Sequence, residues 1–292
     1  MLAVVLAIGI AACGGAATQP ASARDRDDDT GNGPFAASRE FTPKSFTARV
    51  VGAGRPMIFI PGLGCPGEVW DDAIGRLPAG NAAHVITLAG FAGQPPIKGA
   101  LAATVRKELI RYIRSHHLDK PIVVGHSQGG VIAYWLAATA PELIGGAIIV
   151  DAGPALADTD VATANALRNV WAQAGDDELE PQVRAAFGSM VGDPKRIEPF
   201  IAAIARSDRH AMGDAIYELV RTDLRPQLAA ISKPVLVVLA DGSYQQRYKS
   251  DVAPIRDHQV VVIPNAHHFV MLDQPIAFAR AVADFLAAHP AR

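Results

Sequence analysis

A serine stands between glycines near the middle of the chain, in the run IVVGHSQGGVIAYWLAA. Residues 121–124 are apolar and β-branched, whereas residues 131–138 are rich in Ala, Leu and aromatics, so Ser127 lies on a predicted turn from a strand to a helix. Gly125 and Gly129 lack the Cβ atoms that would collide in so sharp a turn. A hydroxyl raised in this way is a candidate nucleophile.

The start of the predicted helix supplies a second chemical group. The first amides of a helix lie at its positive end, beginning here with that of Gln128. They can stabilise the oxyanion that forms when Ser127 attacks a carbonyl carbon. A solvated serine in a glycine-rich turn is the alternative that this pattern leaves open.

A serine nucleophile needs a base within hydrogen-bond reach, and histidines are the candidates. His267 and His268 are adjacent in the last part of the chain. His126 precedes Ser127, but adjacent side chains diverge across a tight turn, so we interpret it as a packing residue. The other histidines show no spacing typical of metal ligands, and neither a metal nor a cofactor is predicted; they are His84, His116, His117, His210 and His258.

The elements that must position these groups alternate from about Phe41 onward. Apolar runs that end near Gly, Pro or Asn alternate with helical stretches; the runs are ARVVG, PMIFIPG, HVITLAG, PIVVGHS, GGAIIVDAG, PVLVVLADG and HQVVVIPNA. Strands that are apolar throughout are buried on both faces, which predicts an α/β fold with a mostly parallel sheet and helices on both faces. Residues 153–232 have helical periodicity but no strand, and we expect a helical insertion there.

Composition limits the classes of partner. The chain has 292 residues, of which 50% are hydrophobic, and a formal net charge of −2. This is typical of a globular protein with a large core. Because no basic stripe or acidic face stands out, neither nucleic acid nor an anionic membrane surface is predicted as a partner. The sequence gives no indication of the oligomeric state.

The N-terminus has a different character. Residues 1–13 form an apolar run that ends in Ile10-Ala11-Ala12-Cys13 and resembles the lipobox of bacterial lipoproteins, although no Lys or Arg precedes it. The resemblance implies that Cys13 carries lipid and that the protein is anchored in the bacterial cell envelope, on the periplasmic face, with no other membrane contact. The alternative is a buried N-terminal helix in a cytoplasmic protein. Residues 14–40 are rich in Gly, Ser and Asp and predict a flexible tether.

Together these motifs resemble the α/β-hydrolase fold family. VVGHSQGG resembles the nucleophile elbow of that family, FIPGLGCPGEVW resembles the loop that supplies an oxyanion amide, and IPNAHHFVMLDQP resembles the segment that carries the catalytic histidine. The resemblance implies an α/β-hydrolase domain over residues 41–292, with a helical cap at about 153–232 inserted after strand six in the numbering of the family.

The same resemblance assigns roles to single residues. In the family the histidine stands before an aromatic or apolar residue, which implies that His268, before Phe269, is the base. The second oxyanion donor would be the amide of Leu63, beside that of Gln128. This chain departs from the family at Pro61, where the family commonly has His, so the usual side-chain anchor of the loop is missing. Cys65 is expected to be a small buried hydrophobe.

The acid has two candidates. In most members of the family it follows strand seven, a position that falls on Ser243 here, while Asp241 comes too early. In other members it follows strand six directly, where GGAIIVDAG places Asp151. We favour Asp151, with Asp241 as the alternative acid, because a carboxylate there could orient the ring of His268 and stabilise its positive charge.

The prediction for function is a serine hydrolase that cleaves an ester or related acyl bond through an acyl-enzyme, with a small-to-medium apolar substrate. Dehalogenases and epoxide hydrolases of this fold use an aspartate where Ser127 stands, which disfavours their reactions. Cofactor-free perhydrolysis, carbon–carbon bond hydrolysis and a non-catalytic, lipid-anchored ligand-binding domain stay open. The acyl pocket is expected to be lined by Leu156, Leu167, Trp171, Phe187, Met190 and Phe200.

Overall fold

The computed structural model describes residues 41–156, 159–242 and 244–291. The predicted signal segment, Cys13 and the tether lie outside these residues. Within them no helix is both long and apolar enough to cross a membrane.

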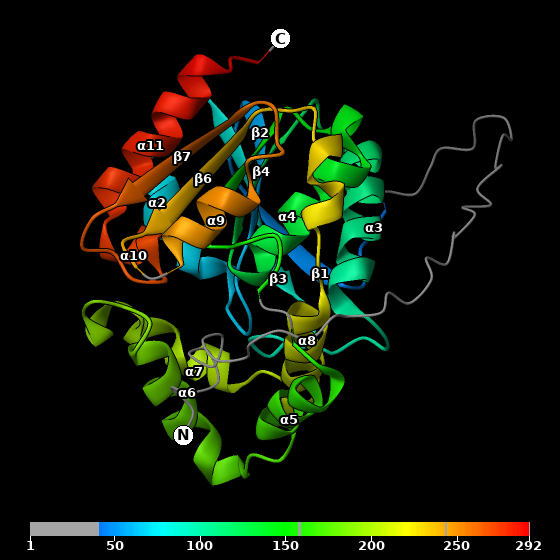
Figure 1. The fold of residues 1–292 in the computed structure, drawn as a ribbon, viewed down its shortest axis with the longest axis vertical. Coiled ribbons are helices and arrows are strands. Elements are labelled where there is room, and N and C mark those ends of the chain that lie inside the picture. Colours follow the sequence, from blue (N-terminus) through cyan, green and yellow to red (C-terminus); the bar gives the residue numbers. More distant parts are fainter. Residues whose placement is uncertain (1–40, 157–158, 243, 292) are drawn as a thin grey trace, which may run out of the picture.

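The centre of the molecule is a seven-stranded sheet in the order β1-β3-β2-β4-β5-β6-β7 (Figure 1). All neighbouring pairs are parallel except β1 and β3, which are antiparallel. The strands are β1 (Phe46–Gly52), β2 (Arg55–Ile60), β3 (Asn81–Leu88), β4 (Ile122–His126), β5 (Gly146–Val150), β6 (Val235–Ala240) and β7 (His258–Ile263). The predicted α/β fold with a mostly parallel sheet is confirmed.

Burial of every strand on both faces was expected, and for the two edge strands, β1 and β7, this expectation is wrong. Val50 and Val51 are 56% and 41% exposed. β1 is the antiparallel edge strand, so it has a neighbour on one side only. The central strands β4 and β5 are buried at every position, as expected of strands between two helical layers.

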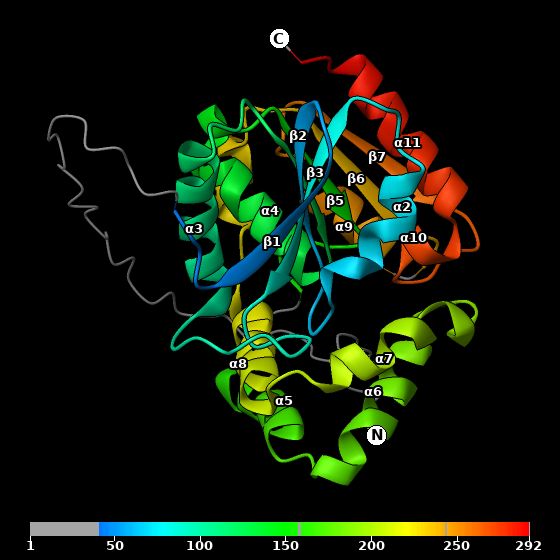
Figure 2. The same cartoon turned by 180° about the vertical axis from the view of Figure 1, so that it is seen from behind.

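Helices lie on both sides of the sheet (Figures 1 and 2). α2 (Asp71–Gly75) and α11 (Pro275–Ala288) pack together on one side, and α3 (Leu101–Ser115) and α4 (Gln128–Thr139) on the other. The shorter helices are η1 (Gly67–Trp70), η2 (Pro141–Leu143), α9 (Gln245–Asp251) and α10 (Val270–Asp273).

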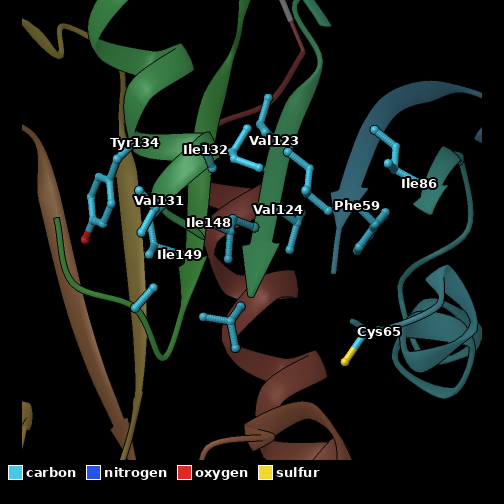
Figure 3. Packing of buried hydrophobic residues seen from close by; sticks show 14 of the residues in the cluster. Phe59, Cys65, Ile86, Val123, Val124, Val131, Ile132, Tyr134, Ile148 and Ile149 are labelled. Carbon is cyan, nitrogen blue, oxygen red and sulfur yellow. The ribbon is translucent and has the colours of Figure 1, made fainter. Parts of the chain in front are cut away.

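The core beside the centre of the sheet joins strands to α4. Figure 3 shows this packing for Val123, Val124, Val131, Ile132, Ile148 and Ile149. All six side chains are almost completely buried. The strand and helix that flank Ser127 are therefore held by a fully buried part of the core.

Between β5 and β6 the described chain forms helices and one isolated bridge, from Ala155 to Asp223, but no strand. The elements are α5 (Val161–Ala172), α6 (Asp176–Gly188), η3 (Pro194–Arg196), α7 (Glu198–Ala205), α8 (Arg209–Arg221) and η4 (Arg225–Ala230). α5 packs on α8 and α6 packs on α7. In Figure 1 these four α-helices gather beyond one end of the sheet.

Candidate active site

Ser127 occupies a strained turn between β4 and α4. Its φ and ψ are 53° and −116°, in a region that non-glycine residues rarely adopt. Its N–H donates to the carbonyl of Val150 at 3.0 Å, and its own carbonyl accepts from the N–H of Gly130 at 2.9 Å. A Cβ at Gly125 would lie 2.1 Å from the carbonyl oxygen of Gly129, so only glycine fits there. These contacts hold the turn that the sequence predicts.

His268 and Asp151 meet at the carboxyl edge of the sheet. The Nδ1 of His268 lies 2.6 Å from Oδ2 of Asp151. The other oxygen, Oδ1, accepts from the N–H of Ala240 at 3.0 Å, and the N–H of Asp151 donates to the carbonyl of Val238 at 2.8 Å. Asp151 is therefore fixed by β6 on one side and holds the imidazole on the other.

The charge of Asp151 follows from these bonds. Burial alone would raise the pKa of this carboxyl, but the hydrogen bond and charge of His268 and the amide of Ala240 together hold the pKa of Asp151 below its ordinary value. The carboxylate is ionised at neutral pH and accepts a hydrogen bond, so the proton of the neutral imidazole lies on Nδ1. The Nε2 of His268 is then left with a lone pair that can accept a proton.

The alternative acid, Asp241, and the second histidine, His267, lie elsewhere. Asp241 is exposed and accepts a hydrogen bond from the side-chain amide of Gln245. The ring of His267 is 55% exposed and lies 3.3 Å from the buried carboxylate of Asp273. Of the residue pairs that the sequence offered, the structure brings together His268 and Asp151.

The predicted oxyanion loop borders the same cavity as Ser127. Gly62 and Leu63 line this cavity, and the N–H of Cys65 donates to the carbonyl of Gly62 at 3.1 Å. Gln128 is the first residue of α4, whose first amides have no carbonyl partner within the helix. Cys65 is buried, and this burial raises the pKa of its thiol, so it is no rival nucleophile.

A different anchor holds the oxyanion loop in the absence of a histidine at Pro61. The hydroxyl of Ser207, between α7 and α8, donates to the carbonyl of Gly64 at 3.3 Å and accepts from the N–H of Ala92 at 2.9 Å. Ser207 is 6% exposed. The helical segment between β5 and β6 thus supports the loop from outside the sheet.

The cavity lies between the carboxyl edge of the sheet and the helical segment. Ser127, Asp151 and His268 border it, and apolar side chains make up most of the rest. Those from the helical segment are Leu156, Trp171, Phe187, Met190, Ile216, Leu219 and Val220. No Lys or Arg is among the described residues that line it.

Two of the expected lining residues do not border this cavity. Leu167 is buried in the packing of α5, which lies against α8. Phe200 is half-buried on α7, which packs against α6. The periodicity of each helix shows that it has an apolar face, but it does not show which residues of that face reach the cavity.

The sequence analysis interpreted His126 as a packing residue and missed its hydrogen bond to the main chain of His268. Its Nε2 lies 2.9 Å from the carbonyl oxygen of His268, and the centroids of the two rings are 4.7 Å apart. The only signal in the sequence was its place beside Ser127. The partner lies 142 positions away, so no local pattern could reveal it.

In the described part of the chain, no three or more His, Cys, Asp or Glu residues are grouped so that they could hold a metal ion. The candidate site is built from Ser127, His268, Asp151 and the backbone amides around them.

A family comparison covers the residues that form this site. The profile of the alpha/beta hydrolase family matches residues 57–281, and the chain belongs to this family. It is an enzyme, a hydrolase.

Two known hydrolases are similar in sequence to more than three quarters of this chain. The pimeloyl-[acyl-carrier protein] methyl ester esterase of Pectobacterium carotovorum is 26% identical over 266 residues, which are 81% of this chain and 96% of that protein. The 2-(acetamidomethylene)succinate hydrolase of Mesorhizobium japonicum is 23% identical, over 84% of this chain and 92% of that protein.

Solved structures share the fold. A hydrolase from Pseudomonas aeruginosa superimposes with a TM-score of 0.73 at 23% identity, and covers 88% of this chain and 99% of its own. An esterase from Exiguobacterium antarcticum has a TM-score of 0.73 at 15% identity, and covers 83% and 95%.

The buried state of His126 predicts how stability depends on pH. Burial above all, and then the nearby His268, lowers the pKa of His126 from 6.5 to about 3. Between these values the unfolded chain binds a proton that the folded chain does not, so this residue makes stability fall as the pH falls from 6.5, by up to about 1.4 kcal/mol per pH unit. His126→Gln should remove this contribution.

The measurement is the free energy of unfolding by urea, for wild type and His126→Gln, at pH values from 7 to 5. We expect the wild type to lose more stability than the variant over this interval. Parallel curves would mean that the ring is protonated in the folded protein as readily as in the unfolded chain.

Proposed function

We propose that this enzyme hydrolyses esters of uncharged, apolar acyl groups through an acyl-enzyme on Ser127. The observation that carries the proposal is the 2.6 Å contact between Nδ1 of His268 and Asp151 at the edge of a cavity that Ser127 also borders. An imidazole held in this way is the base that a serine nucleophile needs.

The reaction has two halves. As the Oγ of Ser127 attacks the carbonyl carbon of the ester, the Nε2 of His268 takes the hydroxyl proton. Asp151 stabilises the imidazolium that forms. The amides of Leu63 and Gln128 donate to the oxyanion. His268 then protonates the leaving alcohol, and the same steps with water in place of the serine release the acid and restore the enzyme.

The acyl group is inferred from the lining of the cavity. Trp171, Phe187 and Met190 offer it apolar surface, and no cation among the described lining residues could pair with a substrate carboxylate. Among the relatives, the lining fits a methyl ester esterase better than a hydrolase named for a succinate. A buried carboxylate without a partner would be costly.

We assign the helical segment of residues 153–232 as a cap over the site. It contributes the apolar wall of the cavity, and its Ser207 holds the oxyanion loop. Substrate therefore binds between this cap and the carboxyl edge of the sheet.

The first test joins nucleophile and substrate class. A fluorophosphonate probe should label wild type at Ser127 and leave Ser127→Ala unlabelled.

The substrate class is tested with two nitrophenyl esters. Wild type should hydrolyse nitrophenyl butyrate with a kcat/KM at least about tenfold above that for the nitrophenyl monoester of succinate, because burying the extra charge costs more than about 1.4 kcal/mol. Labelling that persists in Ser127→Ala, or equal rates for the two esters, would contradict the proposal.

The second test concerns the acid. Asp151→Asn should lower kcat by up to about 10⁴-fold, because the imidazole is then held in the wrong tautomer. Asp241→Asn is the matched control, since its carboxylate is exposed and bonded to Gln245. It should retain kcat within about twofold. Steady-state kinetics on both folded variants decide between them, and the reverse ranking would make Asp241 the acid.

We also propose that Cys13 carries lipid and anchors the enzyme in the cell envelope, on the strength of the lipobox-like sequence that precedes it. Protein made in a bacterial host should partition into detergent and lack residues 1–12 by intact mass. Cys13→Ala should stay in the aqueous phase or remain uncleaved. An intact mass that includes residues 1–12 would show that the sequence is coincidental.

A further inference from the structure

His126 lies at a junction of the candidate site. It is the last residue of β4, directly before Ser127, and it is 1% exposed. Its ring centroid is 4.7 Å from that of His268 and 4.7 Å from that of Phe269. On another side, the ring of Trp70 meets it edge-on at 6.3 Å.

The hydrogen bond of this ring has one possible direction. A backbone carbonyl only accepts, so Nε2 of His126 donates to the carbonyl oxygen of His268 at 2.9 Å. Burial, and then the nearby His268, lowers the pKa of His126 to about 3, so the ring is neutral at neutral pH. Its single proton therefore lies on Nε2. The side chain is a fixed donor rather than a second base.

Gly62 of the oxyanion loop lies close to the opposite edge of this ring. A Cβ built at Gly62 would lie 2.9 Å from Nδ1 of His126 and 3.3 Å from Cβ of Ser127. The oxyanion loop therefore packs directly on one edge of the ring, while the loop of His268 is bonded to the other. One side chain spans both loops.

The topology explains why His268 needs such a bond. The nucleophile follows β4 and the histidine follows β7, and β5 and β6 lie between these strands in the sheet. The loop after β7 must therefore reach back across two strands. Asp151 holds the ring of His268 by Nδ1, and the N–H groups of His267 and Phe269 donate to Asp273 and Met190. None of these three bonds connects the main chain of this loop to β4, the strand that leads into Ser127.

We infer that His126 is a positioning residue: its Nε2–H holds the backbone of His268 at a set distance from Ser127, so that the two reacting side chains stay in register. This role rests on the proposed function. It adds a link between nucleophile and base that runs through the main chain, beside the link that Asp151 makes to the ring.

The test compares donors at this position on nitrophenyl butyrate. Phe keeps a ring but removes the donor, whereas Gln carries an amide nitrogen the same number of bonds from Cβ as Nε2 of His. We expect His126→Phe to lower kcat about 10- to 100-fold, with KM changed less than about threefold, because a small misplacement of the base slows the chemistry rather than binding. His126→Gln should recover kcat to within about fivefold of wild type.

Two controls separate positioning from folding. His84→Phe removes another buried histidine, bonded to the hydroxyl of Tyr112 at 2.9 Å and outside the cavity, and should retain wild-type kcat. If His126→Phe fails to fold, His126→Asn replaces it, because its amide is one bond too short to reach the carbonyl of His268; Gln should then exceed Asn at least fivefold in kcat.

The outcomes are distinct. A folded His126→Phe with wild-type kcat, or Gln no better than Phe or Asn, would overturn the positioning role while leaving the proposed function intact. A wild-type enzyme that neither hydrolyses the ester nor reacts with the fluorophosphonate would overturn both.

Discussion

The hydrogen bond between His268 and Asp151 depends on how β5 pairs with β6 at the carboxyl edge of the sheet. The N–H and the Oδ1 of Asp151 are both bonded to β6, at Val238 and Ala240, and these bonds fix the carboxylate that holds the imidazole. The pairing of β5 with β6 thus sets the place of Asp151, and Asp151 sets the orientation of the His268 ring. Any shift of register between these strands would move the carboxylate away from His268.

The helical segment of residues 153–232 is bonded to two loops at the edge of the cavity. Ser207 donates to the carbonyl of Gly64, while the buried carboxylate of Asp273 accepts from the N–H of Gly192 in the helical segment at 2.9 Å and from the N–H of His267 at 2.7 Å. A segment tied at these points supports the candidate site as well as forming a wall of the cavity.

Local patterns predicted the elements of this fold and the turn that carries Ser127, because a strand, a sharp turn and a helix are each encoded by neighbouring residues. The choice of Asp151 over Asp241 rested on the same kind of local information, the distance from the end of a strand. The errors concern partners that sequence spacing does not encode. Exposure of Val50, packing of Leu167 and the bond from His126 all depend on which elements become neighbours.

Ser127 and Asp151 share the same backbone geometry. Each follows directly on a buried strand, each has a positive φ, 53° for Ser127 and 44° for Asp151, and each N–H donates to a carbonyl of the next strand, at 3.0 and 2.8 Å. A left-handed turn at a residue with a side chain costs of order 1 to 3 kcal/mol. The last ladder bond of each strand opposes that cost and turns the side chain out of the sheet. Two fully buried strands, β4 and β5, therefore hold the strain at the two positions where these side chains leave the sheet.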